Sequence, residues 1–243
     1  MKITFPPDDI SECGGWRNSR QYEALPNVFP VVSYLIMLWC VGNHMICYMQ
    51  AGGDQEVFRD LQLKFGAMKV LDPWGEPVWK FLSSCFIHSS ETLIHLIFNM
   101  MWLYTLGPLM ERGIGSLKFL LFVVVTGFCS SALQTSIDGA GVGFSGVVYA
   151  MAGFMWAAWP RWTGFLEKFR GSTIKFLLFW QVICFLIPMM RVGNIAHVSG
   201  MIIGGVIGLW ACWGNKNGFK WLLASCAIVA FSISVVFYSP WNI

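Results

Sequence analysis

The run IAHVSGMIIGGVIGLWACW, residues 195–213, holds one histidine, one serine and no Asp, Glu, Lys or Arg. An apolar stretch of this length approaches the ~20 residues that cross a bilayer as a helix. Gly200, Gly204 and Gly208 recur every four residues, so they share one helical face, which allows another helix to approach closely. The stretch therefore predicts a membrane helix with a small-residue packing face and a polar group, His197, near its start.

The rest of the chain has the same apolar character. Of its 243 residues 56% are hydrophobic and only 12% are charged, whereas soluble domains usually carry about 25% charged residues. So little charge cannot cover a water-soluble globule. We therefore predict an all-α polytopic membrane protein whose helices follow the long apolar runs. These runs lie at 28–50, 92–110, 117–136, 145–160, 173–190, 195–213 and 219–238.

The predicted organisation has three parts. Residues 1–27 are polar and mixed in charge, so they indicate a cytoplasmic N-terminal segment rather than a cleavable signal peptide. A six-helix core is expected over 28–214, with a long outer loop at 51–91, and 219–238 forms an additional C-terminal transmembrane helix. With the N-terminus inside, the inner segments hold eleven Lys and Arg and the outer segments hold five. This asymmetry favours a cytoplasmic N-terminus.

Polar side chains are costly inside a membrane helix, so the few that occur are candidates for function. His95 and Asn99 lie four residues apart and share one face of the second run. Ser145 opens the fourth run, and His197 opens the sixth. Under the predicted topology all three runs begin at the outer side of the membrane. The four polar groups should therefore lie at one depth, which predicts a site.

The predicted chemistry is nucleophilic. A serine hydroxyl is a weak nucleophile until a neighbouring imidazole takes its proton, and Ser145 and His197 supply that pair if their helices touch. No Asp or Glu follows Glu167 in the chain, so we expect a Ser–His dyad rather than a triad. Tyr149, one turn after Ser145, is placed to pack against the imidazole.

Acyl transfer also needs hydrogen-bond donors for the developing oxyanion. The side chains of His95 and Asn99 can donate, and so can the backbone N–H of Ser145 at a helix start. Each piece alone has a structural reading: small residues pack helices, and a histidine or asparagine can link two helices. The joint arrangement favours catalysis. The chain has no CxxC pair and no basic run, so we expect no metal, no cofactor and no nucleic-acid partner.

Three motifs together resemble the signature of the rhomboid family in order and spacing, over about Trp79 to Gly208. They are His95-x-x-x-Asn99, Gly143-x-Ser145-Gly146 and Ala196-His197-x-x-Gly200. The resemblance implies a rhomboid-like six-helix bundle plus one C-terminal helix. It also implies that Ser145 is the nucleophile and His197 the general base. It further implies that the oxyanion hole is formed by His95, Asn99 and the Ser145 backbone. The supporting residues are Gly143, Gly146, Tyr149 and Gly200.

The implied activity is that of an intramembrane serine endopeptidase, which needs no metal or cofactor. Its substrates would be transmembrane or juxtamembrane segments of other membrane proteins in the lipid bilayer. One alternative is a non-catalytic rhomboid-like factor that binds membrane proteins for quality control, but such members typically lack the serine or the histidine. Another is a transporter or channel, against which the lack of carboxylates inside the helices argues.

Two of the departures from the family pattern concern charged residues. Trp79-Lys80 resembles a Trp-Arg loop motif with lysine in place of arginine, which weakens bidentate contacts and predicts a less firmly anchored loop. Glu111-Arg112 resembles the family's Glu-x-Arg with the arginine one place early. We expect these two side chains to form an ion-paired cap at the cytoplasmic end of the second run.

Overall fold

A computed structural model describes most of the chain, and every regular element in the described residues is helical. The predicted N-terminal segment, 1–27, lies outside the described residues. The described ranges are 28–69, 75–89, 93–139, 141–159, 171–187, 192–213 and 218–238.

Each of the seven predicted apolar runs forms a helix, so the all-α membrane fold class is confirmed. Four of these helices, α1, α4, α5 and α8, are long and apolar enough to cross a membrane, and the apolar parts of the other three are shorter. The seven helices are α1 (Val31–Ala51), α4 (Leu93–Ile114), α5 (Ser116–Asp138), α6 (Ser145–Ala158), α7 (Gly171–Leu186), α8 (Asn194–Trp213) and α9 (Gly218–Tyr238).

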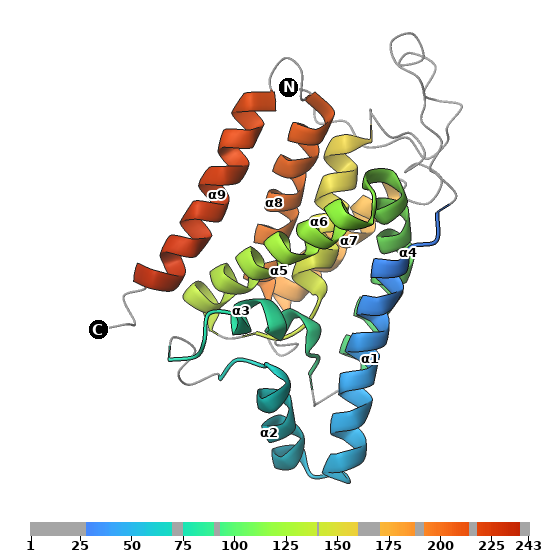
Figure 1. Ribbon diagram of the computed structural model, residues 1–243, viewed down its shortest axis with the longest axis vertical. Coiled ribbons are helices and arrows are strands. Elements are labelled where there is room, and N and C mark those ends of the chain that lie inside the picture. The colour runs from blue at the N-terminus through green and yellow to red at the C-terminus, as the bar shows by residue number, and fades with distance from the viewer. Residues whose placement is uncertain are drawn as a thin grey trace.

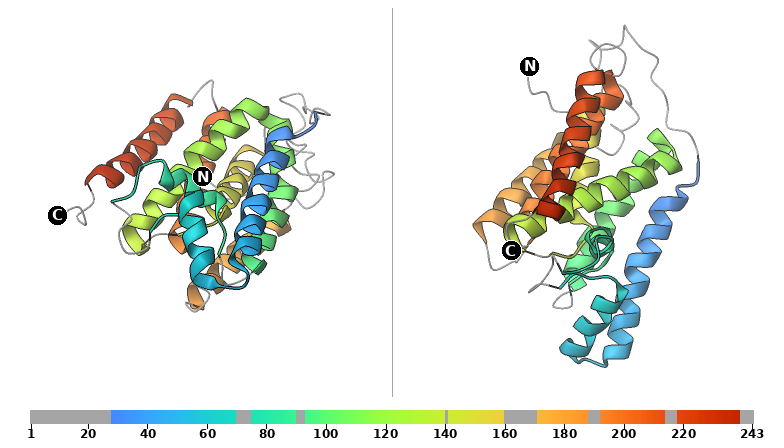
Figure 2. Two further views of the ribbon diagram at one scale, coloured as in Figure 1. Left: turned by 60° about the horizontal axis from the view of Figure 1, so that its bottom comes forward. Right: turned by 60° about the vertical axis from the view of Figure 1, so that its left-hand side comes forward.

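The shortest of the seven, α6, lies at the centre of the bundle (Figure 1). It contacts α4, α5, α7 and α8, and most of its side chains are buried. At 1.5 Å per residue its 14 residues rise only about 21 Å, less than the ~30 Å of a bilayer's hydrocarbon core. At least one end of α6 therefore lies below the membrane surface, inside the protein. By contrast, α9 packs on α8 and α5 at the edge of the bundle (Figure 2).

The closest helix pair, α6 and α8, packs backbone against backbone. A Cβ added at Gly200 would collide with the carbonyl oxygen of Gly146, and one added at Gly204 would collide with that of Ala150. One turn further, a Cβ at Gly208 would lie 2.6 Å from the carbonyl oxygen of Phe154. The predicted small-residue packing face is confirmed. At these three positions α6 and α8 lie so close together that no side chain larger than glycine's hydrogen fits between them.

The described part of the long loop contains three short elements, α2 (Gln55–Phe65), α3 (Lys80–Ser83) and the 3-10 turn η2 (Ser84–Phe86). The carboxylate of Asp54 caps α2 by accepting hydrogen bonds from the backbone N–H groups of Glu56 and Val57 in its first turn. In Figure 1, α2 lies beside the lower end of α1, and α3 lies against α5. The loop therefore covers one end of the bundle.

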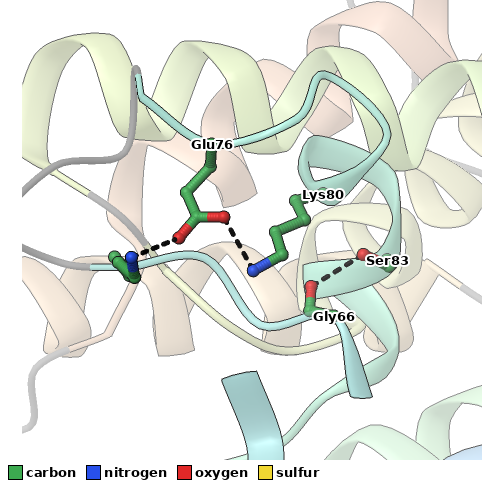
Figure 3. A network of polar contacts seen from close by, with 5 residues as sticks. Gly66, Glu76, Lys80 and Ser83 are labelled. Carbon is green, nitrogen blue, oxygen red and sulfur yellow. Dashed lines mark hydrogen bonds and ion pairs between the residues drawn. The ribbon is translucent and has the colours of Figure 1, made fainter. Parts of the chain in front are cut away.

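The loop is anchored by a buried ion pair rather than loosened by the lysine. Lys80 Nζ lies 2.7 Å from Glu76 Oε2, and the two side chains are 11% and 8% exposed (Figure 3). The hydrogen bond from Lys80 lowers the pKa of Glu76 below its ordinary value of 4.5. Ser83 adds a hydrogen bond of 2.7 Å to the Gly66 carbonyl. Lys80 therefore anchors the loop through a single carboxylate oxygen, without the bidentate contact that an arginine could make.

The predicted Glu111–Arg112 ion pair is also wrong. The buried carboxylate of Glu111 accepts hydrogen bonds from the backbone N–H groups of Val32 and Ser33, at 2.9 and 2.8 Å. It also accepts from the hydroxyls of Ser33 and Ser116, at 2.8 and 2.7 Å. Arg112 instead donates to a backbone carbonyl ahead of α1. Glu111 therefore caps the start of α1, where free N–H groups favour a negative charge, and joins α1 and α5 to α4.

Candidate active site

Ser145 is the first residue of α6, at the end of a turn that requires glycine. Gly143 has a φ of +121°, a conformation that other residues rarely adopt. Its N–H donates to the Ser84 carbonyl at 3.2 Å, which ties the turn to η2. The backbone N–H of Ser145 has no acceptor within α6, because the first N–H groups of any helix lack one. Its side chain is partly exposed.

His197 lies in the first turn of α8 and is 3% exposed. Its ring stacks on that of Tyr149, with centroids 4.3 Å apart and planes 12° from parallel. The hydroxyl of Tyr149 donates to the Leu177 carbonyl of α7 at 3.1 Å, which holds the tyrosine in place. The predicted packing of Tyr149 on the imidazole is confirmed. Ser145 is four residues before Tyr149 and so shares its face of α6, which brings Ser145 to the side of α6 that faces His197.

The two imidazole nitrogens of His197 have different surroundings. Nδ1 lies 2.8 Å from Oε1 of Gln181 on α7. Nε2 is buried and makes no hydrogen bond to any residue that the structure describes, so the hydroxyl of Ser145 is not bound to it here. Hydrogen bonds between catalytic groups often form only when substrate is present. An imidazole held at Nδ1 with a free Nε2 is suited to accept a proton.

His95 and Asn99 of α4 face the turn before Ser145. A Cβ at Gly143 would lie 2.6 Å from His95 Nε2 and 3.7 Å from Asn99 Nδ2. His95 Nδ1 accepts a hydrogen bond of 3.4 Å from the N–H of Ser89, so Nε2 is the protonated nitrogen and can donate. Asn99 uses one amide hydrogen on the His95 carbonyl, at 2.9 Å, and keeps the other. The structure thus brings together all four polar residues that the sequence singled out.

Two more histidines lie close to this cluster. The ring of His88 is 5.4 Å from that of His95, and burial lowers its pKa well below the ordinary 6.5, so it is neutral. Its carbonyl accepts from the Gln62 side chain of α2 at 2.5 Å. His44 packs edge-on against Phe58. Within the described ranges no three His, Cys, Asp or Glu side chains converge as metal ligands do.

Three amide side chains near His197, two of them buried, were not predicted from the sequence. Gln181 contacts the imidazole directly, and Asn194 contacts Gln181. Gln134 of α5 accepts a hydrogen bond of 3.1 Å from the N–H of Ala196, which secures the start of α8. A signal was available, because Gln181 is a lone amide within an apolar run, as Asn99 is.

The fold and this cluster define a class: a polytopic helical membrane protein with a serine, two histidines and an asparagine gathered around the start of a short central helix. Comparison with known proteins gives the family. A model of the rhomboid domain matches residues 75–214, more than half of the chain. The chain therefore belongs to the rhomboid family, and it is a multi-pass membrane protein.

Two curated relatives carry the name Rhomboid protease GlpG. The protein from Yersinia pseudotuberculosis serotype I (strain IP32953) is 30% identical over 187 residues. That from Yersinia enterocolitica serotype O:8 / biotype 1B (strain NCTC 13174 / 8081) is 31% identical over 187 residues. In both cases the match covers 76% of this chain and 63% of the relative, so the chain spans under two thirds of their length.

Proposed function

We propose that this protein is an intramembrane serine endopeptidase in which Ser145 is the nucleophile and His197 is the general base. The observation that carries the proposal is the stack of His197 on Tyr149, one helical turn from Ser145, with a free Nε2 on the imidazole. Family membership and the name of the curated relatives support the same reaction.

The proposed reaction begins with proton transfer. His197 Nε2 takes the hydroxyl proton of Ser145 while Oγ attacks the carbonyl carbon of the scissile peptide bond. The resulting oxyanion accepts hydrogen bonds from His95 Nε2, Asn99 Nδ2 and the backbone N–H of Ser145. The imidazolium then gives its proton to the leaving amine. Water, deprotonated by the same imidazole, hydrolyses the acyl-enzyme and regenerates Ser145.

The glycines at the site have proposed supporting roles. Gly143 leaves the space beside His95 free, because any Cβ there would touch the imidazole. Gly146 and Gly200 allow the starts of α6 and α8 to meet, which brings Ser145 and His197 within reach of each other. In this proposal no metal and no cofactor takes part.

The proposed substrates are transmembrane or juxtamembrane segments of other membrane proteins, reached from the lipid bilayer. Residues 28–214 would form the catalytic core, and 219–238 would add one transmembrane helix. The N-terminus would be cytoplasmic and the active site would lie toward the outer side. This placement follows the distribution of Lys and Arg and the short α6, which leaves room for water at its end.

The test is cleavage of a model transmembrane substrate by the purified full chain in liposomes. Ser145→Ala and His197→Ala should each lower the rate at least about a hundredfold, because each removes one partner of the proton transfer. Ser199→Ala is the matched control. Its hydroxyl lies on the same helix as His197 but donates to the Ile195 carbonyl, so the rate should stay near that of the unmodified protein.

A fluorophosphonate probe separates the protease from a non-catalytic rhomboid-like binding protein. The unmodified chain should be labelled, and labelling should be lost in Ser145→Ala but kept in Ser199→Ala. Undiminished cleavage by Ser145→Ala or His197→Ala would refute the mechanism. Absence of both labelling and cleavage in the folded, unmodified chain would favour the non-catalytic alternative.

A further inference from the structure

A chain of three hydrogen bonds leads from the backbone of α7 to the imidazole of His197. Asn194 Nδ2 donates to the Cys184 carbonyl at 3.4 Å. Gln181 Nε2 donates to Asn194 Oδ1 at 2.8 Å. Gln181 Oε1, at 2.8 Å from His197 Nδ1, completes the chain. Gln181 is 8% exposed, so water competes little for these bonds.

The direction of every bond in this chain follows from its first member. The carbonyl of Cys184 can only accept, so Asn194 must present its NH2 group there and its oxygen to Gln181. An oxygen can only accept as well, so Gln181 must donate its NH2 group to Asn194. The remaining Gln181 oxygen faces the imidazole, and its partner, His197 Nδ1, must carry a proton.

We infer that Gln181 is a positioning residue that holds the imidazole of His197 as the Nδ1–H tautomer and thereby keeps Nε2 free for the proton of Ser145. This inference rests on the proposed function. A neutral imidazole carries one proton on either nitrogen, and only the tautomer with a bare Nε2 can act as a base at that atom. The partner of Nδ1 is the side-chain oxygen of Gln181, so an amide takes the orienting role that an aspartate has in a triad.

The stacked tyrosine and the glutamine constrain different motions of the imidazole. Tyr149 lies parallel to the ring and restrains its tilt, but a stacked ring cannot distinguish the two nitrogens. Gln181 bonds within the plane of the ring, so it fixes both the rotation of the imidazole and the position of its proton. Removal of the Gln181 amide should therefore impair the reaction even where His197 stays buried and stacked.

Activity measurements on two substitutions test this role. Gln181→Met keeps the length of the side chain but has no oxygen, so kcat should fall about tenfold to a hundredfold with little change in KM. Gln181→Glu keeps an acceptor oxygen for Nδ1–H and should retain more of kcat than Gln181→Met. Val182→Leu is the matched control, because Val182 is the next residue of α7 and is 55% exposed on its outer side.

A second readout does not depend on cleavage. In protein labelled with nitrogen-15 histidine, the His197 signals should show a protonated Nδ1 and an unprotonated Nε2, assigned by their loss in His197→Asn. Gln181→Met should convert them to the averaged signals of two exchanging tautomers. Val182→Leu should leave the signals unchanged.

Three outcomes would overturn the inference: a protonated Nε2 in the unmodified protein, an unchanged kcat and tautomer in Gln181→Met, or equal losses in Gln181→Met and Gln181→Glu. The last would mean that Gln181 matters only for packing. These results differ from failure of the proposed function, which would appear as persistent cleavage in Ser145→Ala. If Ser145 and His197 are essential and Gln181→Met changes nothing, the inference alone is wrong.

Discussion

The helices α6 and α7 both contact His197, the proposed base, but their contacts with the rest of the bundle are of two different kinds. The contact of α6 with α8 is made by backbone, because carbonyl oxygens of α6 occupy the space where the Cβ atoms of Gly200 and Gly204 would be. The contacts of α7 are made by long side chains, among them the hydrogen bond of Gln181 to His197. Ser145 and His197 are therefore fixed relative to each other more rigidly than either is fixed to α7.

Aromatic side chains form two further contacts of α7, both with α4. Phe98 of α4 stacks on Trp180 with ring centroids 5.2 Å apart, and Trp102 meets Phe176 at 6.0 Å. The outer side of α7 is exposed, and Phe179 on that side has 62% of its surface accessible. A contact between long side chains can adjust by changes of rotamer, whereas a contact between two backbones cannot. The pair of Ser145 and His197 is therefore held rigidly, whereas α7 beside it can adjust.

The largest effect is expected at the backbone contact. In Gly204→Ala the new methyl group would collide with the Ala150 carbonyl, so the substitution should cost about 3 kcal/mol or more of stability and lower the thermal midpoint in detergent. Gly205→Ala is the control one residue away, where the nearest atom to the new Cβ is 3.7 Å distant. It should be neutral or stabilise by up to about 1 kcal/mol. Equal midpoints for the two variants would contradict a backbone contact.

A side chain can also hold a helix rigidly when its hydrogen bonds are buried. Substitution of Glu111 tests whether this is so for α1. Glu111→Ala leaves the N–H groups of Val32 and Ser33 without their acceptors, so we expect a loss of about 2–4 kcal/mol in unfolding free energy. Glu56→Ala, at an exposed glutamate in the first turn of α2, should change it by less than about 0.5 kcal/mol. A small effect at Glu111 would show that α1 is held by its apolar contacts alone.

The loop pair Glu76–Lys80 should give a smaller effect that depends on pH. Since Lys80 lowers the pKa of Glu76 in the folded protein, the pair stabilises the fold above the ordinary pKa of 4.5, and this contribution is lost as the pH falls through the lowered value. Glu76→Gln should therefore lower the thermal midpoint at neutral pH, and the difference from the unmodified protein should narrow in acid. A difference that is constant with pH would argue against the ion pair.

The smallest effect is expected between α4 and α7. A double-mutant cycle of Phe98→Leu and Trp180→Leu should give a coupling of about 0.5–1.5 kcal/mol, the usual range for a stacked aromatic pair. The control cycle combines Phe98→Leu with Phe179→Leu, at the neighbouring exposed residue, and should give a coupling near zero. A coupling as large as the loss in Gly204→Ala would contradict the view of α7 as the more loosely held helix.

The parts of this structure that were predictable from sequence are those that depend on one helix at a time. Apolar length located the seven helices, and the four-residue spacing of Gly200, Gly204 and Gly208 located a packing face. The cost of polar groups in a membrane pointed to Ser145 and His197. The position of Tyr149, one turn after Ser145, was enough to expect its contact with the imidazole.

The parts that were not predictable depend on which partner a side chain finds. Glu111 accepts hydrogen bonds from residues 78 and 79 positions earlier in the chain, and no local pattern connects them. Whether Lys80 could replace an arginine depended on a single carboxylate, that of Glu76. To predict the contact of Gln181 with His197, one would need to know which face of α7 points toward α8. That orientation is set by the neighbouring helices and not by the sequence of α7 alone.

The length of α7 has a consequence for the surrounding lipid. Its 16 residues rise about 24 Å, and the exposed side chains of Phe179 and Val182 lie on its outer face. A hydrophobic helix shorter than the hydrocarbon core favours a locally thinner bilayer around it. The acyl-chain length of the host membrane thus acts on the helix that carries Gln181, the hydrogen-bond partner of His197.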